Sequence, residues 1–391
     1  MSVTHPKGFL AAGVSAGIKA SGKPDLALVV NEGPQYIGVG VFTGNRVQAA
    51  PVTWSRQVAA DGRIDAVVLN SGGANAATGA AGFADTHATA EHVAASLQAT
   101  GKEVSSADVA VCSTGLIGVR LPMDTLLTGV DMAVHSLSAQ GGSDAATAIM
   151  TTDTVAKTAV IDRDGWSIGA MAKGAGMLAP GMATMLCVIT TDAVVDAATA
   201  RLALSEAVRT TLNRLDSDGC MSTNDTVILL SSGASQESPE PSAFQAALTL
   251  VCHDLAQQLL RDAEGASHDI AITVNGATSE AAAEAVARAV SRSNLFKAAI
   301  FGQDPNWGRV IAAVGTVPES VAPFDASALD VTINGIQVCR AAGVGDDREL
   351  VDLSDRDVTV TIDLHAGAAS ATVWTNDLTH DYVTENSAYS S

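Results

Sequence analysis

Short apolar runs alternate with helical patterns along the first two thirds of the chain. Runs rich in Val, Leu and Ile predict strands at 26–31, 36–42, 65–69 and 108–112, a strand pair within 158–171, and further strands at 183–191 and 226–231. Apolar residues at helical spacing predict helices at 83–100, 121–140, 195–215 and 243–262. Because strands and helices alternate, the pattern indicates an α/β fold.

The pattern changes past Gly265. Short alternating strands are predicted at 269–275, 328–334, 357–364 and 371–376, with helices at 279–290 and 307–314. We therefore expect a smaller C-terminal α+β subdomain over about 269–391, after a main body that continues to about 268. The pattern does not determine the order of the strands in either part.

The composition narrows the classes of partner. Of the 391 residues, 47% are hydrophobic and only 4% aromatic, so we expect cores of aliphatic side chains and alanine. A formal net charge of −20 argues against nucleic acid as a partner, because binding a phosphate backbone requires clustered Lys and Arg. No apolar run reaches about 18 residues, and the first residues lack an apolar signal core. We therefore expect no membrane partner and a cytoplasmic location.

The cysteines and histidines give no metal signature. The five cysteines are odd in number, widely spaced and without a C-x-x-C pair, and the eight histidines form no H-E-x-x-H pattern. We expect neither a disulfide framework nor a bound metal.

The most informative segment is the glycine-rich turn that begins at Lys173 and runs, through Ala183, into a β-prone strand headed by Thr184. A threonine hydroxyl is a poor nucleophile unless a base lies beside it, and cleavage between Ala183 and Thr184 would create that base, the α-amino group of Thr184. The unperturbed pKa of such an amine, about 7.7 to 8.0, suits a general base near neutral pH. From residue types alone, an ordinary loop followed by a buried strand is the favoured interpretation of this segment.

Other motifs are weaker. Gly13-Val-Ser15-Ala-Gly17 fits G-x-S-x-G, but a nucleophile elbow follows several strands of a sheet, and only about a dozen residues precede this one. Gly174-Ala-Gly176 and the segment 70–79 complete no nucleotide-binding fingerprint. The sequence therefore does not favour a hydrolase elbow, a dehydrogenase or a kinase.

The full string Lys-Gly-x-Gly-Met-x-x-Pro-x-Met-Ala-Thr-Met-Leu, which starts at Lys173, resembles the self-cleavage and nucleophile signature of the ornithine acetyltransferases, the glutamate N-acetyltransferases of arginine biosynthesis. Further segments resemble the same family in the same order; they are 70–79, 112–118, 148–154, 222–226, 262–265, 304–309 and 385–391. The resemblance spans the chain from about Lys7 onward.

The resemblance implies an α/β/β/α sandwich of the self-cleaving N-terminal-nucleophile type. It implies cleavage into an alpha chain of residues 1–183 and a beta chain of residues 184–391, which assemble as an alpha2beta2 heterotetramer. In this interpretation Thr184 is both the residue exposed by the cut and the nucleophile. Thr114 and Gly115 then form the oxyanion hole.

The same resemblance implies which residues bind substrate. They are Thr151 with its neighbour Thr152, Lys173, Thr184, Glu264, Asn386 and Ser391. Lys173 is expected to pair with a substrate carboxylate and Glu264 with the ornithine ammonium. From the residues alone, each has an ordinary alternative: Thr114 and Gly115 as a strand-ending turn, Lys173 and Glu264 as solvated side chains, and the tail as a frayed terminus.

The implied reaction is a ping-pong transfer of an acetyl group from N-acetylornithine to glutamate through an acetyl-Thr184 intermediate. It requires no dissociable cofactor, and acetyl-CoA is a co-substrate in some members of the family. Two alternatives remain open on the sequence: a self-processing aminopeptidase or amidase, in which water is the acceptor, and an uncleaved binding protein.

Overall fold

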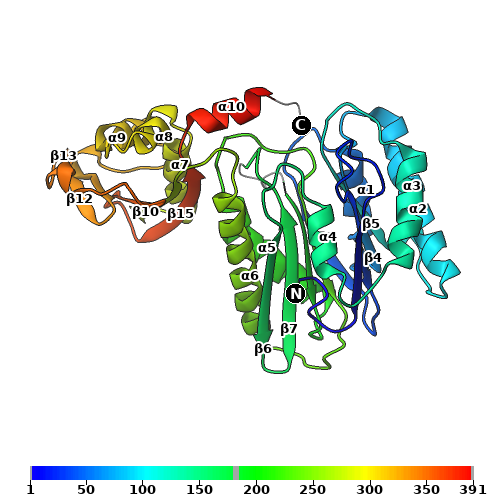
Figure 1. The fold of residues 1–391 in the computed structure, drawn as a ribbon. Coiled ribbons are helices and arrows are strands. Elements are labelled where there is room, and N and C mark those ends of the chain that lie inside the picture. The colour runs from blue at the N-terminus through cyan, green and yellow to red at the C-terminus, as the bar shows by residue number, and fades with distance from the viewer. Residues whose placement is uncertain (1, 179–184, 389–391) are drawn as a thin grey trace.

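The computed structural model describes residues 2–178 and 185–388. Within these ranges the chain forms three sheets, two in the main body and one in a C-terminal lobe (Figure 1). The first sheet has the order β1 (Phe9–Val14), β2 (Leu26–Asn31), β4 (Ala66–Ser71) and β5 (Val109–Thr114). Its neighbours are antiparallel except β4 and β5, which run parallel and end side by side.

The second sheet has the order β3 (Ile37–Phe42), β9 (Thr226–Ser231), β8 (Leu186–Thr191), β7 (Trp166–Lys173) and β6 (Lys157–Arg163). β8 is antiparallel to β7 and parallel to β9, so it lies at the centre of this sheet. All six residues of β8 are buried, which explains why its first four residues, 186–189, are apolar without alternation.

The two sheets pack face to face around one core. Val67 and Leu69 from β4 meet Val188 from β8 and Ile228 from β9 in this core. The short helices α1 (Ala50–Val58) and α4 (Gly142–Ala148) contribute Val58, Ala145, Ala146 and Ala148 to it.

Helices cover the outer face of each sheet. The first sheet is covered by α2 (Gly79–Ala99) and α3 (Met123–His135), and the second by α5 (Ala197–Thr210) and α6 (Pro241–Arg261). Figure 1 shows these helices on opposite sides of the paired sheets. The main body is therefore an α/β/β/α sandwich, and the fold class that the resemblance implied is confirmed.

The C-terminal lobe has its own sheet and its own core. The sheet has the order β13 (Gly343–Val344), β12 (Ile336–Arg340), β11 (Asp330–Ile333), β14 (Asp357–Asp363), β10 (Asp269–Ala277) and β15 (Ala369–Asn376). Its helices are α7 (Glu280–Ser291), α8 (Asn294–Phe301) and α9 (Trp307–Val314). Ile272, Val286 and Val360 belong to the apolar cluster between the helices and the sheet. The chain then leaves the lobe as α10 (His380–Ala388), which extends toward the sandwich (Figure 1).

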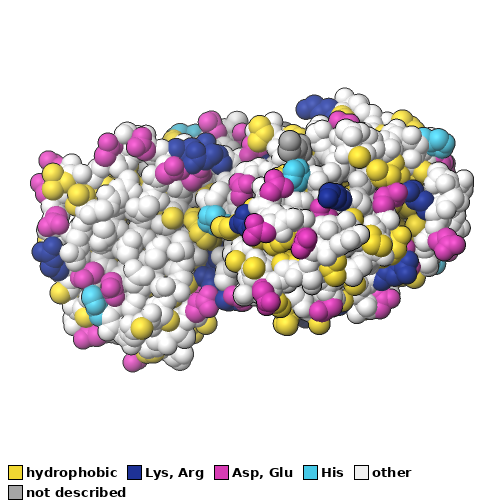
Figure 2. All heavy atoms as spheres, turned by 90° about the horizontal axis from the view of Figure 1, so that it is seen from below, with side chains coloured by type: hydrophobic (Ala, Val, Ile, Leu, Met, Phe, Trp, Pro, Cys, Tyr) yellow, Lys and Arg dark blue, Asp and Glu magenta, His cyan; other side chains and the backbone are white. Residues whose placement is uncertain are grey.

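The surface carries the negative charge that the composition predicts. Figure 2 shows acidic side chains distributed over one whole face, with Lys and Arg between them. Within the two described ranges, no helix is both long and apolar enough to cross a membrane. The five cysteines are unpaired, and no cluster of metal-ligating side chains occurs among the described residues.

The sequence pattern placed several boundaries differently from the structure. β5 extends two residues beyond the predicted end to Thr114, and β7 ends at Lys173, so both residues belong to strands rather than to the loops that follow. The predicted helix 121–140 is only Met123–His135. The pattern also did not predict β1, whose Ala-Ala-Gly sequence has low strand propensity and which forms by pairing with β2.

Candidate active site

The end of β5 presents Thr114 and Gly115. Thr114 is buried, and its carbonyl accepts hydrogen bonds from Gly72 N at 2.9 Å and Gly73 N at 3.0 Å. Gly115 has a φ of +131°, and a Cβ at this position would lie 2.6 Å from Gly73 N. Only glycine fits where two backbones approach this closely. The segment after β4 therefore fixes the backbone beside Thr114.

Asn224 joins this strand end to the second sheet. Its Nδ2 donates to Ser113 O at 2.8 Å and to Ala74 O at 2.6 Å. The next residue, Asp225, is fully buried, and its Oδ1 accepts a hydrogen bond from Met185 N at 3.0 Å. Asn224 and Asp225 thus link the end of β5 to the residue that precedes β8.

Lys173 is the last residue of β7 and is 1% exposed. It pairs in register with Leu186 of β8, and its Nζ lies 4.0 Å from Asp153 Oδ2. Burial lowers the pKa of Lys173, while the nearby carboxylate of Asp153 acts in the opposite direction. Burial and the Asp153 carboxylate therefore act in opposite directions on the charge of the Lys173 side chain.

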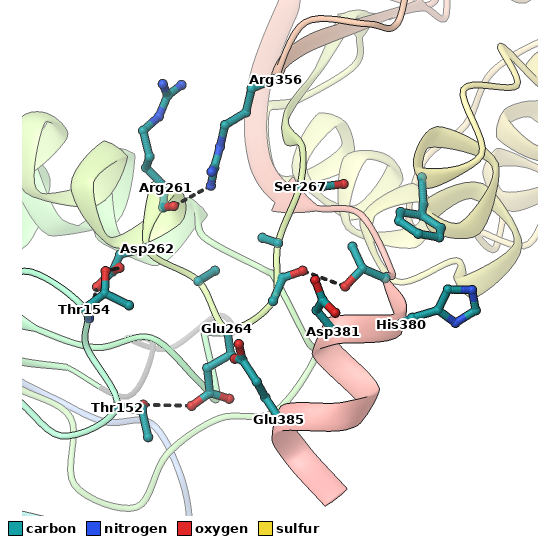
Figure 3. A pocket seen from close by; sticks show the side chains of 15 residues that line it. Thr152, Thr154, Arg261, Asp262, Glu264, Ser267, Arg356, His380, Asp381 and Glu385 are labelled. Atoms are coloured by element: carbon teal, nitrogen blue, oxygen red, sulfur yellow. Dashed lines mark hydrogen bonds between the residues drawn. The ribbon is translucent and has the colours of Figure 1, made fainter. Parts of the chain in front are cut away.

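Glu264 lies in the turn after α6. Its Oε1 accepts a hydrogen bond from Thr152 Oγ1 at 2.8 Å, as Figure 3 shows. A Cβ at Gly176 would lie 2.6 Å from Glu264 Oε2, so a larger residue at 176 would push this carboxylate aside. Thr151 lies beside Thr152, and its N–H donates to Asp153 Oδ2 at 2.9 Å.

These segments enclose one small cavity of about 60 Å³. Its lining residues are Thr114, Gly115, Thr151, Thr152, Lys173, Gly176, Met177, Glu264 and Asn386. The structure thus brings together Thr114, Gly115, Thr151, Lys173, Glu264 and Asn386, which the sequence singled out from distant segments. Ala183, Thr184 and Ser391 lie outside the described residues.

Helix α10 closes one side of the cavity. Gly265 has a φ of +63°, and a Cβ there would lie 2.2 Å from Tyr382 N, so the helix rests directly on this glycine. Thr379 Oγ1 donates to Gly265 O at 2.6 Å and accepts from Tyr382 N at 2.9 Å. These contacts hold Asn386 at the cavity, where its Nδ2 donates to Tyr382 O at 3.0 Å.

A wider groove of about 680 Å³ adjoins the cavity at Glu264 and runs between the sandwich and α10. Thr152, Asp262, Glu264 and Glu385 line it, as Figure 3 shows. Burial raises the pKa of Glu385, and the neighbouring carboxylate of Glu264 raises it further. Arg261 and Arg356 line the same groove, so it carries charged groups of both signs.

The sequence did not identify Asp153, Asn224 or Asp225 as part of the site. All three lie in segments that resemble the family, 148–154 and 222–226, so the signal was present. Their roles depend on burial and on contacts between distant segments, which the sequence pattern does not contain.

The fold and the site define a class of protein: an α/β/β/α sandwich with a cavity lined by hydroxyl, ammonium and carboxylate groups at one end of its two sheets. The chain belongs to the ArgJ family, whose model matches residues 10–391.

Full-length relatives support this membership. The chain is 62% identical over 391 residues to the arginine biosynthesis bifunctional protein ArgJ of Streptomyces coelicolor, with 100% of both chains covered. It is 56% identical over 393 residues to the protein of the same name from Mycobacterium tuberculosis, covering 100% of this chain and 96% of the relative. A crystal structure of ornithine acetyltransferase complexed with ornithine, from M. tuberculosis, matches 47% of this chain and 96% of its own at 62% identity and a TM-score of 0.46.

Proposed function

We propose that this protein transfers an acetyl group from N-acetylornithine to glutamate through a covalent acetyl-Thr184 intermediate, in arginine biosynthesis. Membership of the ArgJ family and the names of its full-length relatives support this function. One structural observation gives this proposed function its strongest support. Thr114, Lys173 and Glu264 come from three distant segments and line one cavity, and Lys173 pairs with Leu186, two residues after Thr184.

The first half-reaction acetylates the enzyme. The Thr184 hydroxyl attacks the acetyl carbon while the α-amino group of the same residue takes the hydroxyl proton. The carbonyl oxygen becomes an oxyanion, to which the Thr114 hydroxyl and the Gly115 N–H donate hydrogen bonds. The bond between the acetyl carbon and the ornithine nitrogen then breaks, the proton passes to that nitrogen, and ornithine leaves.

The second half-reaction reverses these roles. The amino group of glutamate attacks the acetyl ester and gives up a proton, and Thr184 is regenerated with its hydroxyl proton restored. Lys173 binds the α-carboxylate that both substrates share, and Glu264 binds the side-chain ammonium of ornithine. Thr151, Asn386 and Ser391 complete the polar contacts with substrate.

The proposal includes self-cleavage between Ala183 and Thr184. The products are an alpha chain of residues 1–183 and a beta chain of residues 184–391, assembled as an alpha2beta2 heterotetramer in the cytoplasm. The second sheet supports a stable complex of the two chains. Its strands β8 and β9 belong to the beta chain, its strands β3, β6 and β7 belong to the alpha chain, and all five are hydrogen-bonded in one sheet. We also propose that no dissociable cofactor is needed and that acetyl-CoA can serve as a second acetyl donor.

An assay of acetyl transfer from N-acetylornithine to glutamate, with and without acetyl-CoA, tests the function. The wild-type protein should show two bands on a denaturing gel and should form N-acetylglutamate. Thr184→Ala should remain one band without activity, whereas Thr184→Ser should retain partial processing. Release of free acetate in place of N-acetylglutamate would identify an amidase instead, and an active protein that stays intact would rule out the Thr184 mechanism.

A further inference from the structure

Asp153 lies between two buried lysines. Its side chain and that of Lys157 are 0% exposed, and that of Lys173 is 2% exposed. Lys157 Nζ lies 2.6 Å from Asp153 Oδ1, and Lys173 Nζ lies 4.0 Å from Asp153 Oδ2. The carboxylate also accepts hydrogen bonds from Gly174 N at 2.6 Å and Thr151 N at 2.9 Å. One aspartate therefore contacts the ends of two segments that line the cavity.

The charge of Asp153 is strongly stabilised at this position. Burial alone would raise the pKa of Asp153, but the positive charges of Lys173 and Lys157 lower it to about 2. The reciprocal effect acts on Lys173. A buried ammonium tends to lose its proton, and an adjacent carboxylate favours the charged form.

A chain of contacts leads from Asp153 to Glu264. Lys157 Nζ, which contacts Asp153, also lies 2.5 Å from Asp262 Oδ2. Asp262 additionally accepts hydrogen bonds from the backbone N–H and the hydroxyl of Thr154. Asp262 precedes Glu264 by two residues in the turn after α6. Figure 3 shows Thr154 at Asp262 and Thr152 at Glu264, on the same side of the groove.

We propose that Asp153 is a positioning residue for substrate recognition: it keeps Lys173 protonated as the carboxylate-binding group and, through Lys157 and Asp262, holds the turn that carries Glu264. This inference rests on the proposed function, because it assigns Lys173 and Glu264 to substrate. It adds a group that does not itself touch substrate and that controls both of the charged groups that do.

Several charged groups lie near Lys173, and the sign of each charge determines whether it raises or lowers the pKa of Lys173. Asp153, Glu264 and, where it is ionised, Asp225 favour its charged form, whereas Lys157 disfavours it. Lys19 also interacts with Lys173 and adds a further positive charge. Removing Asp153 should therefore lower the pKa of Lys173, and removing Lys157 should raise it.

Two substitutions test the proposal through these opposite effects. Asp153→Asn should raise the KM for both N-acetylornithine and glutamate by about tenfold or more above neutral pH, and should move the alkaline limb of kcat/KM to lower pH by roughly one unit or more. Lys157→Met should move the same limb to higher pH. Asp192→Asn is the matched control, because Asp192 is a buried carboxylate that accepts hydrogen bonds from Ser167 N and Lys7 N.

The pH profiles separate positioning from a merely structural role. A loss of folded protein lowers kcat without moving the limb, and thermal unfolding with the two-band pattern on a gel measures that loss. The proposal would be overturned if the alkaline limb of kcat/KM shifted in the same direction in Asp153→Asn and Lys157→Met. It would also be overturned if the limb stayed at the wild-type pH in both variants. If Asp153→Asn does not fold, Lys157→Met decides the matter, because its limb must still move upward.

A binding measurement separates this inference from the proposed function. Calorimetric titration with ornithine across the same pH range measures the ornithine affinity, which is proposed to depend on Lys173 and Glu264, without any turnover. A wild-type protein that makes no N-acetylglutamate refutes the proposed function. A wild-type protein that does, combined with an Asp153→Asn variant whose ornithine affinity follows the wild-type pH dependence, refutes the inference alone.

Discussion

Thr152 Oγ1 donates a hydrogen bond of 2.8 Å to Glu264 Oε1 across 112 positions of sequence. The contact ties the segment after α4 to the turn after α6 and orients one carboxylate oxygen of Glu264. The hydroxyl of Thr152 is neutral, so this contact orients the Glu264 carboxylate without itself cancelling its negative charge. This arrangement is the basis for the first prediction.

Glu264→Gln should discriminate between the two substrates. Ornithine carries a side-chain ammonium and glutamate does not, so the variant should raise the KM for N-acetylornithine by roughly ten- to hundredfold, the usual cost of losing a charged hydrogen bond. The KM for glutamate is the internal control and should change much less. Steady-state kinetics with each substrate varied in turn measures both values, and an equal rise in the two would exclude an ammonium-binding role for Glu264.

Thr114→Ala should reduce the rate of the chemical step. The hydroxyl is expected to donate to the oxyanion in both half-reactions, and loss of one such donor typically lowers kcat by about 10²- to 10³-fold. The KM for N-acetylornithine should change far less. Thr114→Ser retains the hydroxyl and should recover most of the rate. A kcat at the wild-type level in the alanine variant would remove Thr114 from the site.

Asp225→Asn should increase the free energy of unfolding relative to the wild-type protein, and this difference should grow as the pH rises. Burial raises the pKa of Asp225 well above its usual range, so the folded state keeps a proton that the unfolded state releases. The stabilising effect of this proton is complete below the unfolded pKa near 3.8 and is lost as pH rises toward the folded pKa, by up to about 1.4 kcal/mol per pH unit. Asparagine keeps the acceptor for Met185 N–H without the titrating group.

Denaturant unfolding of wild type and Asp225→Asn at several pH values tests this prediction. The difference in unfolding free energy should grow in favour of the variant between pH 4 and pH 8. A difference that is constant with pH would show that Asp225 is ionised in the folded protein.

Gly265→Ala should displace α10 from the cavity. The added methyl group would lie 2.2 Å from Tyr382 N, and the φ of +63° at this position disfavours alanine by about 1 kcal/mol or more. We expect a lower kcat/KM while the cut between Ala183 and Thr184 still occurs. Gly335→Ala is the matched control, because Gly335 also has a positive φ, +84°, but nothing within 4 Å.

A truncation completes this test. Deleting residues 380–391 should lower kcat/KM in the same way, and Gly265→Ala should then cause little further loss. An additional large loss in the truncated protein would show that Gly265 acts through the turn of Glu264 rather than through α10.

The sequence predicted elements well where burial produces a clear pattern. Strands β2 and β9 have the predicted bounds because both are continuous apolar runs buried on two faces. Pairing could not be predicted. β3 and β9 are far apart in the sequence of the sandwich, yet they pair with Ile37 opposite Ser231. No local sequence pattern specifies that contact. Helix α10 was also missed, because none of its residues is buried and its sequence lacks an apolar face.

The residues of the candidate site also divide into those that the sequence identified and those that only the structure identified. Thr114, Lys173 and Glu264 were identified because each lies in a segment with a recognisable family motif. Asp153 lies in such a segment as well, yet its importance comes from two lysines that the fold buries beside it. A sequence motif indicates that a segment matters, whereas the partner of a buried charge becomes evident only when strands from distant parts of the chain are in place.

The position of β8 also constrains how the protein can be produced. Strands β8 and β9 lie between β3 and β7, so a fragment starting at residue 184 would insert two adjacent strands into the middle of a sheet whose remaining strands lie on another fragment. Made separately, each fragment would present unpaired strand edges, a known cause of aggregation. Separately expressed halves should therefore fail to complement one another, and mature molecules should not exchange halves after cleavage.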